Sequence, residues 1–115
     1  MPAYWFYFTR QPPLRAGEKP LGAVHMTEVA FAMNVLDTID RPWTPADRKL
    51  ADTMASYWTN FAKTGDPNGD GLPKWPRYKT DEVMEFGDHV GPIAPPDPRE
   101  LAWFRSYFAK LQGFP

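Results

Sequence analysis

Cysteine is absent from this chain of 115 residues, which excludes both disulfide bonds and thiolate metal sites. An excess of either charge is also lacking, because 13 Lys and Arg residues stand against 14 Asp and Glu residues. The formal net charge of −1 provides no basic patch of the kind that binds a phosphate backbone. We therefore expect no nucleic acid among the partners of the protein.

Long apolar runs are missing too, and the N-terminus lacks the charged and apolar regions of a signal peptide. We expect neither a bilayer-spanning segment nor a membrane partner. The sequence has no Gly-rich phosphate loop, no internal repeat and no His, Asp and Glu cluster at metal-ligand spacing, so we expect no metal and no cofactor. Residues 66–71 (DPNGDG) open like an EF-hand calcium loop. Arg77 stands where the twelfth position requires Glu, however, and the segment is interpreted as a turn.

Aromatic residues, by contrast, are abundant. They make up 16% of the chain, and apolar residues as a whole make up 43%, which is enough for one domain with its own core. Fourteen Pro and eight Gly residues predict short elements joined by much loop. We therefore expect residues 1–115 to form a single unit.

Two segments are predicted to be strands. Residues 3–9 (AYWFYFT) are nearly all aromatic, which is typical of a strand covered on both faces. The only other convincing strand is residues 83–86 (VMEF). Two strands so far apart in sequence make a poor sheet by themselves. The aromatic strand therefore indicates that the chain is part of something larger.

Three helices are predicted. The one with the clearest limits runs from about Pro45 to Lys63, with Thr44 as N-cap, Asp47 as its capping partner and Gly65 at the C-terminus. Its apolar residues recur at helical spacing and are interpreted as core rather than as a cofactor site. They are Leu50, Met54, Tyr57, Trp58 and Phe61.

The other two helices are predicted on either side of this one. Residues 28–37 (EVAFAMNVLD) form the first of them. Its expected buried stripe consists of Val29, Met33 and Leu36, with Ala30 and Phe31 widening it. The last helix is expected to follow Asp97 as N-cap, with Glu100 as capping partner, and to stop at Gly113. Its predicted buried residues are Leu101, Phe104, Phe108 and Leu111.

The candidate catalytic residue is His25, one of two histidines. It lies in residues 22–28 (GAVHMTE), a turn that precedes the first predicted helix. Histidine is the side chain whose ordinary pKa lies near neutrality, so a well-placed imidazole can both accept and return a proton. The alternative is a surface or core-edge histidine satisfied by a backbone carbonyl. The second histidine, His89, lies in a turn of sequence GDHVG, and no chemistry is assigned to it.

Three stretches of the chain carry a family resemblance. Residues 22–31 (GAVHMTEVAF) are similar to the pattern G-A-x-H-G-x-E-hydrophobic-x-[FY]. Residues 57–68 (YWTNFAKTGDPN) are similar to W-x-x-F-A-x-x-G-x-P-N. Residues 75–78 (WPRY) resemble W-P-x-[FY], and residues 83–88 (VMEFGD) resemble a closing strand. In this order the stretches resemble the C-terminal part of type-B carboxylesterases, the α/β-hydrolase family that includes the cholinesterases, over about residues 3–111.

The resemblance implies an α/β fold, mostly helical as a fragment, with one aromatic strand, a histidine loop, three helices and a short closing strand. It implies that His25 is the general base of a Ser–His–acid triad. It also implies that Glu28 is a supporting polar residue near the triad and not its acid. Met26 departs from the pattern, because the family usually has Gly there, and it is expected to crowd the loop beside the imidazole.

The nucleophile of such a triad is not found in the chain. In α/β-hydrolases the serine and the acid precede the histidine, and the serine lies in a G-x-S-x-G elbow. The residues before His25 contain no serine, and their only acid is Glu18. Ser56 and Ser106 lie in helical patterns without the flanking glycines of an elbow. The chain alone is therefore expected to be almost inert by this mechanism.

Three functions remain open. The leading one is a segment of a serine carboxylic-ester hydrolase that supplies His25 and acts on a small-molecule ester together with the remainder of the hydrolase domain. The second is a non-catalytic truncated relative that self-associates or binds an apolar ligand through its aromatic surface. The third is a miniature esterase with a rearranged site, using Ser56 or Ser106 with His25. If the chain stands alone, the paired edges missing from its aromatic strand predict an oligomer or a swapped dimer.

Overall fold

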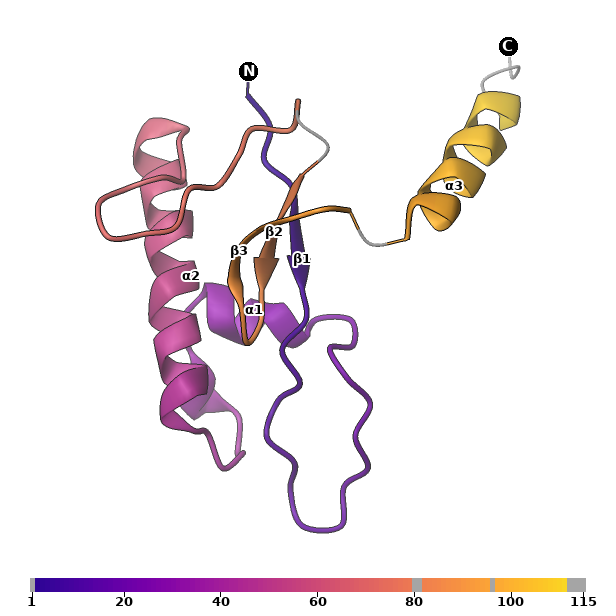
Figure 1. Ribbon diagram of the computed structural model, residues 1–115. Helices are drawn as coiled ribbons and strands as arrows, with labels where there is room; N and C mark the ends of the chain where they lie inside the picture. Colours follow the sequence, from indigo (N-terminus) through magenta and orange to yellow (C-terminus); the bar gives the residue numbers. More distant parts are fainter. Residues whose placement is uncertain (1, 80–81, 96, 112–115) are drawn as a thin grey trace.

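A computed structural model describes residues 2–79, 82–95 and 97–111 (Figure 1). The elements follow one another as β1 (Phe6–Phe8), α1 (Thr27–Ala32), the 3₁₀ turn η1 (Leu36–Thr38), α2 (Pro45–Thr64), β2 (Val83–Phe86), β3 (Val90–Ile93) and α3 (Pro98–Leu111). Helices α1 and α2 pack on each other and lie beside a small mixed sheet (Figure 1). The predicted α/β class with three α-helices is confirmed.

The sheet has the strand order β1-β2-β3. Strand β1 runs parallel to β2, with Phe6 opposite Met84 and Phe8 opposite Phe86, and β3 runs antiparallel to β2. The sequence analysis missed β3, because it contains Pro92 and follows a turn. Since Pro cannot donate a hydrogen bond to a ladder, it is tolerated on an edge strand, and β3 is one. The sheet therefore has three strands rather than the two predicted.

Strand β1 is shorter and less covered than predicted. It spans three residues of the expected seven, and Tyr7 is 45% exposed, so the strand is not buried on both faces. Within residues 2–79, 82–95 and 97–111, only β2 pairs with it, and its other edge is open. The central strand β2 is different, because Val83, Met84 and Phe86 are fully buried. The open edge of β1 agrees with the expectation that this strand lacks a neighbour.

Helix α2 begins and ends as predicted. The Thr44 hydroxyl accepts a hydrogen bond from the Asp47 amide, and the Asp47 carboxylate accepts one from the Thr44 amide at 2.8 Å. Gly65 ends the helix in the left-handed conformation, with φ of 76°. Leu50, Met54 and Tyr57 are buried, as predicted, and Trp58 is partly buried. The prediction was wrong at Phe61, which is 40% exposed because it lies near the end of the helix beside the apolar hollow. Local capping chemistry therefore fixes both limits of this helix.

Helix α1 is shorter than predicted. It ends at Ala32 because Asn34 adopts a left-handed backbone conformation, with φ of 52°, which an α-helix cannot continue through. The predicted buried stripe was wrong at Val29 and Met33, which are exposed. It was right at Ala30, Phe31 and Leu36, which are buried. The ring of Phe31 packs against the rings of Phe8 and Trp43, with centroids 5.2 Å and 5.7 Å away.

Helix α3 forms where it was predicted, but its burial was predicted wrongly. The Asp97 carboxylate accepts a hydrogen bond from the Arg99 amide at 2.9 Å, as expected of an N-cap, whereas Gly113 lies outside the described residues. The helix extends away from the sheet and the other helices (Figure 1), so no element covers its apolar face in the described part of the chain. Its exposed large residues are Trp103, Phe104, Tyr107, Phe108 and Leu111.

Candidate active site

His25 lies in the turn that leads into α1. The Thr27 amide donates to the Val24 carbonyl at 3.1 Å, and this closes the turn around the histidine. The imidazole is exposed, and no residue of the described segments forms a hydrogen bond with it. His25 is thus a surface histidine, as in the alternative interpretation, but without the backbone-carbonyl partner of that interpretation among the described residues.

Met26, the next residue, has a left-handed backbone conformation, with φ of 69° and ψ of 0°. For a residue other than Gly this conformation costs roughly 1–2 kcal/mol. The side chain is 59% exposed, so packing does not offset the cost. The family pattern has Gly at this position, and a Gly would have indicated a positive φ. Crowding of the imidazole was predicted here from the sequence, whereas the backbone strain was not.

Glu28 lies in the first turn of α1 and is half-buried. No hydrogen bond joins its carboxylate to His25 or to another residue of the described chain. Glu28 thus follows His25 by three positions, across the start of α1, without a hydrogen bond between the two groups. Its supporting role stays a prediction.

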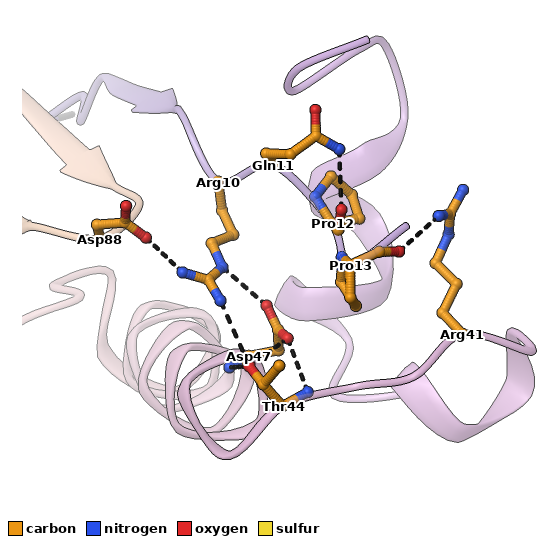
Figure 2. A network of polar contacts seen from close by, with 8 residues as sticks. All are labelled: Arg10, Gln11, Pro12, Pro13, Arg41, Thr44, Asp47 and Asp88. Atoms are coloured by element: carbon orange, nitrogen blue, oxygen red, sulfur yellow. Dashed lines mark hydrogen bonds and ion pairs between the residues drawn. The ribbon is translucent and has the colours of Figure 1, made fainter. Parts of the chain in front are cut away.

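The loop before His25 is closed on itself by Gln11. The side-chain oxygen of Gln11 accepts a hydrogen bond from the Gly22 amide at 2.5 Å. The side-chain nitrogen of Gln11 donates to the Pro12 carbonyl at 2.8 Å, which orients the amide (Figure 2). Gln11 thus ties the exit of β1 to a residue three positions before His25.

Arg41 holds the middle of the same loop. Its guanidinium donates to both carboxylate oxygens of Glu18, at 2.7 Å and 2.8 Å, and to the Pro13 carbonyl at 2.8 Å (Figure 2 shows the last contact). The hydrogen bonds from Arg41 to the Glu18 carboxylate, together with one from the Arg15 amide, lower the pKa of Glu18 from 4.5 to about 2. The sequence analysis missed this pair, because Glu18 and Arg41 are 23 positions apart and no local pattern links them.

Arg10 joins three elements at the base of this loop (Figure 2). Its guanidinium donates to Asp47 at 2.8 Å and to the Thr44 hydroxyl at 3.4 Å, and it forms an ion pair with Asp88 in the turn between β2 and β3. The Asp47 side chain is fully buried. Burial raises the pKa of Asp47, but the hydrogen bonds from Arg10 and Thr44 outweigh it and hold the pKa below 3.8.

The second histidine has the carboxylate partner that His25 lacks. His89 Nδ1 lies 2.9 Å from a carboxylate oxygen of Glu85, whose other oxygen accepts a hydrogen bond from the Thr9 hydroxyl at 2.9 Å. Neither serine forms a hydrogen bond with either ring in the described part of the chain. The hydroxyl of Ser56 donates to the Asp52 carbonyl, and that of Ser106 to the Trp103 carbonyl. The structure therefore gives no Ser–His contact to support a miniature esterase.

The segment that resembles a calcium loop is an Asx turn in the structure. The Asp66 carboxylate accepts hydrogen bonds from the amide and the side chain of Asn68, at 2.9 Å and 2.7 Å. These bonds lower the pKa of Asp66. In the part of the chain that the structure describes, no group of three or more His, Asp or Glu residues is arranged to hold a metal ion. The same part contains no helix long and apolar enough to cross a bilayer.

An apolar hollow of about 190 Å³ lies between β1 and α2. Its lining is mainly aromatic and includes Tyr4, Phe6, Trp58, Phe61 and Trp75. None of its lining residues belongs to the histidine turn, so the hollow is separate from His25.

The fold matches that of solved esterases. A thermophilic PNB esterase superposes on 88% of the chain with a TM-score of 0.69 and 24% identity, and the chain covers 21% of it. A carboxylesterase of Geobacillus stearothermophilus superposes on 88% of the chain with a TM-score of 0.66 and 29% identity, with 21% of that protein covered. The chain therefore has part of an α/β-hydrolase fold.

The sequence identifies the family within this fold. Residues 1–93 match the sequence model of the carboxylesterase family. The medium-chain fatty acyl-CoA hydrolase precursor of Anas platyrhynchos is 39% identical over 88 residues, which are 70% of this chain and 15% of the relative. The liver carboxylesterase of Sus scrofa is 31% identical over 112 residues, which are 95% of this chain and 20% of the relative. The chain belongs to the carboxylesterase family, and it spans a fifth or less of the length of these relatives.

Proposed function

We propose that this chain is the histidine-bearing segment of a carboxylic-ester hydrolase, with His25 as the general base. The observation that carries the proposal is the position of His25 at the end of a closed loop, within the residues that match the family. The imidazole is exposed there and has no polar partner among the described residues. The relatives named above are hydrolases or esterases, which supports an ester of a small molecule as substrate.

The chemistry of the proposed site follows from the imidazole. His25 Nε2 accepts the proton of a serine hydroxyl as the serine attacks the ester carbonyl. It then returns this proton to the leaving alcohol, and the sequence repeats with water as nucleophile to release the acid. An imidazole can both accept and return a proton, which suits both directions of transfer. The serine, the triad acid and the oxyanion hole belong to residues outside this sequence.

Two exposed surfaces of the chain support the proposal that a partner covers them. The open edge of β1 presents unpaired backbone groups, and the aromatic face of α3 is exposed. The chain covers 21% of the solved esterases on which it superposes, and those proteins have the rest of a hydrolase domain. We propose the remainder of such a domain as the partner that covers both surfaces.

The test uses a grafted esterase, in which this chain replaces the matching fifth of the Geobacillus stearothermophilus carboxylesterase. A serine-directed phosphonate is expected to label the grafted esterase and to leave the isolated chain unlabelled. With His25→Gln in the graft, labelling is expected to slow by several orders of magnitude, because the base of the triad is lost. A graft that folds, as judged by circular dichroism, and takes up no probe contradicts the proposal. Labelling of the isolated chain at Ser56 or Ser106 supports the miniature esterase instead.

A second candidate, a non-catalytic relative that self-associates, is favoured by one observation. The large aromatic residues of α3 are exposed together, and such a patch on a soluble domain is typical of an interaction surface. In this function the isolated chain forms an oligomer or a swapped dimer at micromolar concentration. A compact monomer in light scattering contradicts it.

A further inference from the structure

His25 lies between two fixed points of the backbone. On its C-terminal side, α1 is anchored by the fully buried Phe31. On its N-terminal side, Gly22 is bound to Gln11 at the exit of β1. The turn that bears the imidazole is therefore short, while the loop that leads to it is long and has no helix or strand of its own. A loop of this length needs its own contacts to keep one conformation.

Those contacts come from Arg41 and Gln11. Arg41 binds Glu18 through two parallel hydrogen bonds and also binds the Pro13 carbonyl, so one side chain joins two points of the loop. The Arg15 side chain adds a hydrogen bond to the Asp40 carbonyl at 2.7 Å, next to Arg41 in sequence. A bidentate guanidinium–carboxylate pair fixes both distance and orientation, which a Lys cannot do.

We propose that Gln11, Glu18 and Arg41, the loop latch, are positioning residues that set the place of His25 for proton transfer. This inference rests on the proposed function of His25. The latch side chains act through the backbone of the loop and touch no reacting atom. A displaced general base stabilises the transition state less, while substrate binding is hardly affected. Loss of the latch is therefore expected to lower kcat and to leave KM nearly unchanged.

Arg48 provides a matched control. Its guanidinium forms a single 2.8 Å ion pair with Asp37 on the surface, outside the loop. Arg48→Lys and Arg41→Lys both keep the positive charge and both remove a planar guanidinium. Differences between the two variants therefore report on the loop and not on charge.

The first measurement uses the 115-residue chain and nuclear magnetic resonance. The Gly22 amide is held by Gln11 within the loop, so its hydrogen exchange reports how often the loop opens. Arg41→Lys and Gln11→Ala are each expected to speed this exchange by about tenfold or more, whereas Arg48→Lys leaves it unchanged. Unchanged exchange of Gly22 in Arg41→Lys overturns the latch.

The second measurement uses the grafted esterase and a p-nitrophenyl ester. Arg41→Lys is expected to lower kcat by about 10- to 100-fold with KM within about twofold, and Arg48→Lys to change neither. Glu18→Asp, which retains the carboxylate, is expected to recover part of the rate that Glu18→Gln loses. A kcat that Arg41→Lys does not lower overturns the positioning role. Activity that survives His25→Gln overturns the proposed function instead, and with it the catalytic meaning of the latch.

Discussion

Helices α2 and α3 have similar sequence patterns and opposite surroundings. Both begin at a Pro behind a capping residue, and both carry large apolar residues on one face. In α2 most of this face is buried against α1 and the rings of Trp75 and Phe86, whereas in α3 the corresponding face is exposed and the helix extends away from the sheet (Figure 1). The comparison teaches that an amphipathic pattern predicts a helix and its apolar face, but the burial of that face depends on a partner.

The sheet repeats the contrast. Strand β2 is covered on both sides, while β1 has one partner strand and an open edge within the described segments. The elements α1, α2 and β2 thus form the closely packed part of the molecule, whereas α3, the edge of β1 and His25 are exposed in the described segments.

The largest expected difference is in the free energy of unfolding that is lost when an aromatic residue of α2 or of α3 is replaced. Tyr57 is fully buried, and its hydroxyl donates to the Pro73 carbonyl at 2.6 Å. Tyr57→Ala is expected to lower the free energy of unfolding by about 3–5 kcal/mol, and Tyr57→Phe by about 1 kcal/mol. Phe104→Ala in α3 is expected to change it by less than about 0.5 kcal/mol. Urea unfolding of the three variants measures the difference. Equal losses at Tyr57 and Phe104 would mean that α3 is packed as closely as α2.

The next effect concerns the acids at the beginnings of the two helices. Asp47 is buried with Arg10, and removal of one partner of such a pair is expected to cost about 3 kcal/mol. Asp97→Ala, at the exposed beginning of α3, is the control and is expected to cost less than about 1 kcal/mol. A loss in Asp47→Ala no larger than the loss in Asp97→Ala contradicts this ordering.

The same pair predicts a dependence on pH. Because the folded-state pKa of Asp47 lies below 3.8, its contribution to stability is present above that pH. The contribution is lost as the pH falls through the lowered pKa. Denaturant unfolding between pH 6 and pH 2 is expected to show an acid loss that Asp47→Ala lacks.

A smaller effect on the free energy of unfolding is expected in the histidine turn. Met26 and Met33 are both 59% exposed, but Met26 is left-handed and Met33 is right-handed, with φ of −89°. Met26→Gly is expected to raise the free energy of unfolding by about 0.5–1 kcal/mol, since strain is relieved at some cost in chain entropy. Met33→Gly is expected to lower it by a similar amount. Thermal unfolding of the two variants decides, and destabilisation by Met26→Gly contradicts the assigned strain.

The smallest expected effect is the loss of the Glu18–Arg41 pair of the loop latch at low pH. The pKa of Glu18 is lowered to about 2, so the pair with Arg41 is complete above 4.5 and is lost as the pH falls through about 2. Side-chain carboxyl chemical shifts measured from pH 6 to pH 1.5 are expected to give Glu18 a titration midpoint well below 4.5. A midpoint near 4.5 for Glu18 means that the latch is open in solution.

Much of the fold follows from local sequence, and the exceptions have physical reasons. The limits of α2 were predicted almost to the residue because Thr44, Asp47 and Gly65 act on their own neighbours. The end of α1 was missed because Asn34 adopts a conformation that residues other than Gly rarely take. The burial of α3 was predicted wrongly because the period of a helix says nothing about its partner.

The candidate site was predicted in part. The position of His25 before a helix followed from its surrounding residues and from the family pattern. The loop latch did not, because its hydrogen bonds join residues 11 and 23 positions apart, and only the fold brings them together. The pair of His89 and Glu85 also escaped prediction, although the two residues are only four positions apart, because the hairpin between β2 and β3 was not foreseen.

The most direct test of the account is the rate of ester hydrolysis by the grafted esterase with His25→Gln, measured beside His89→Gln. His89 is the natural control, since it has a carboxylate partner and no assigned role in proton transfer. We predict that His25→Gln lowers kcat by about a thousandfold or more, while His89→Gln changes it by less than about twofold. A loss below about tenfold for His25→Gln, or equal losses in the two variants, would contradict the claim that His25 is the general base.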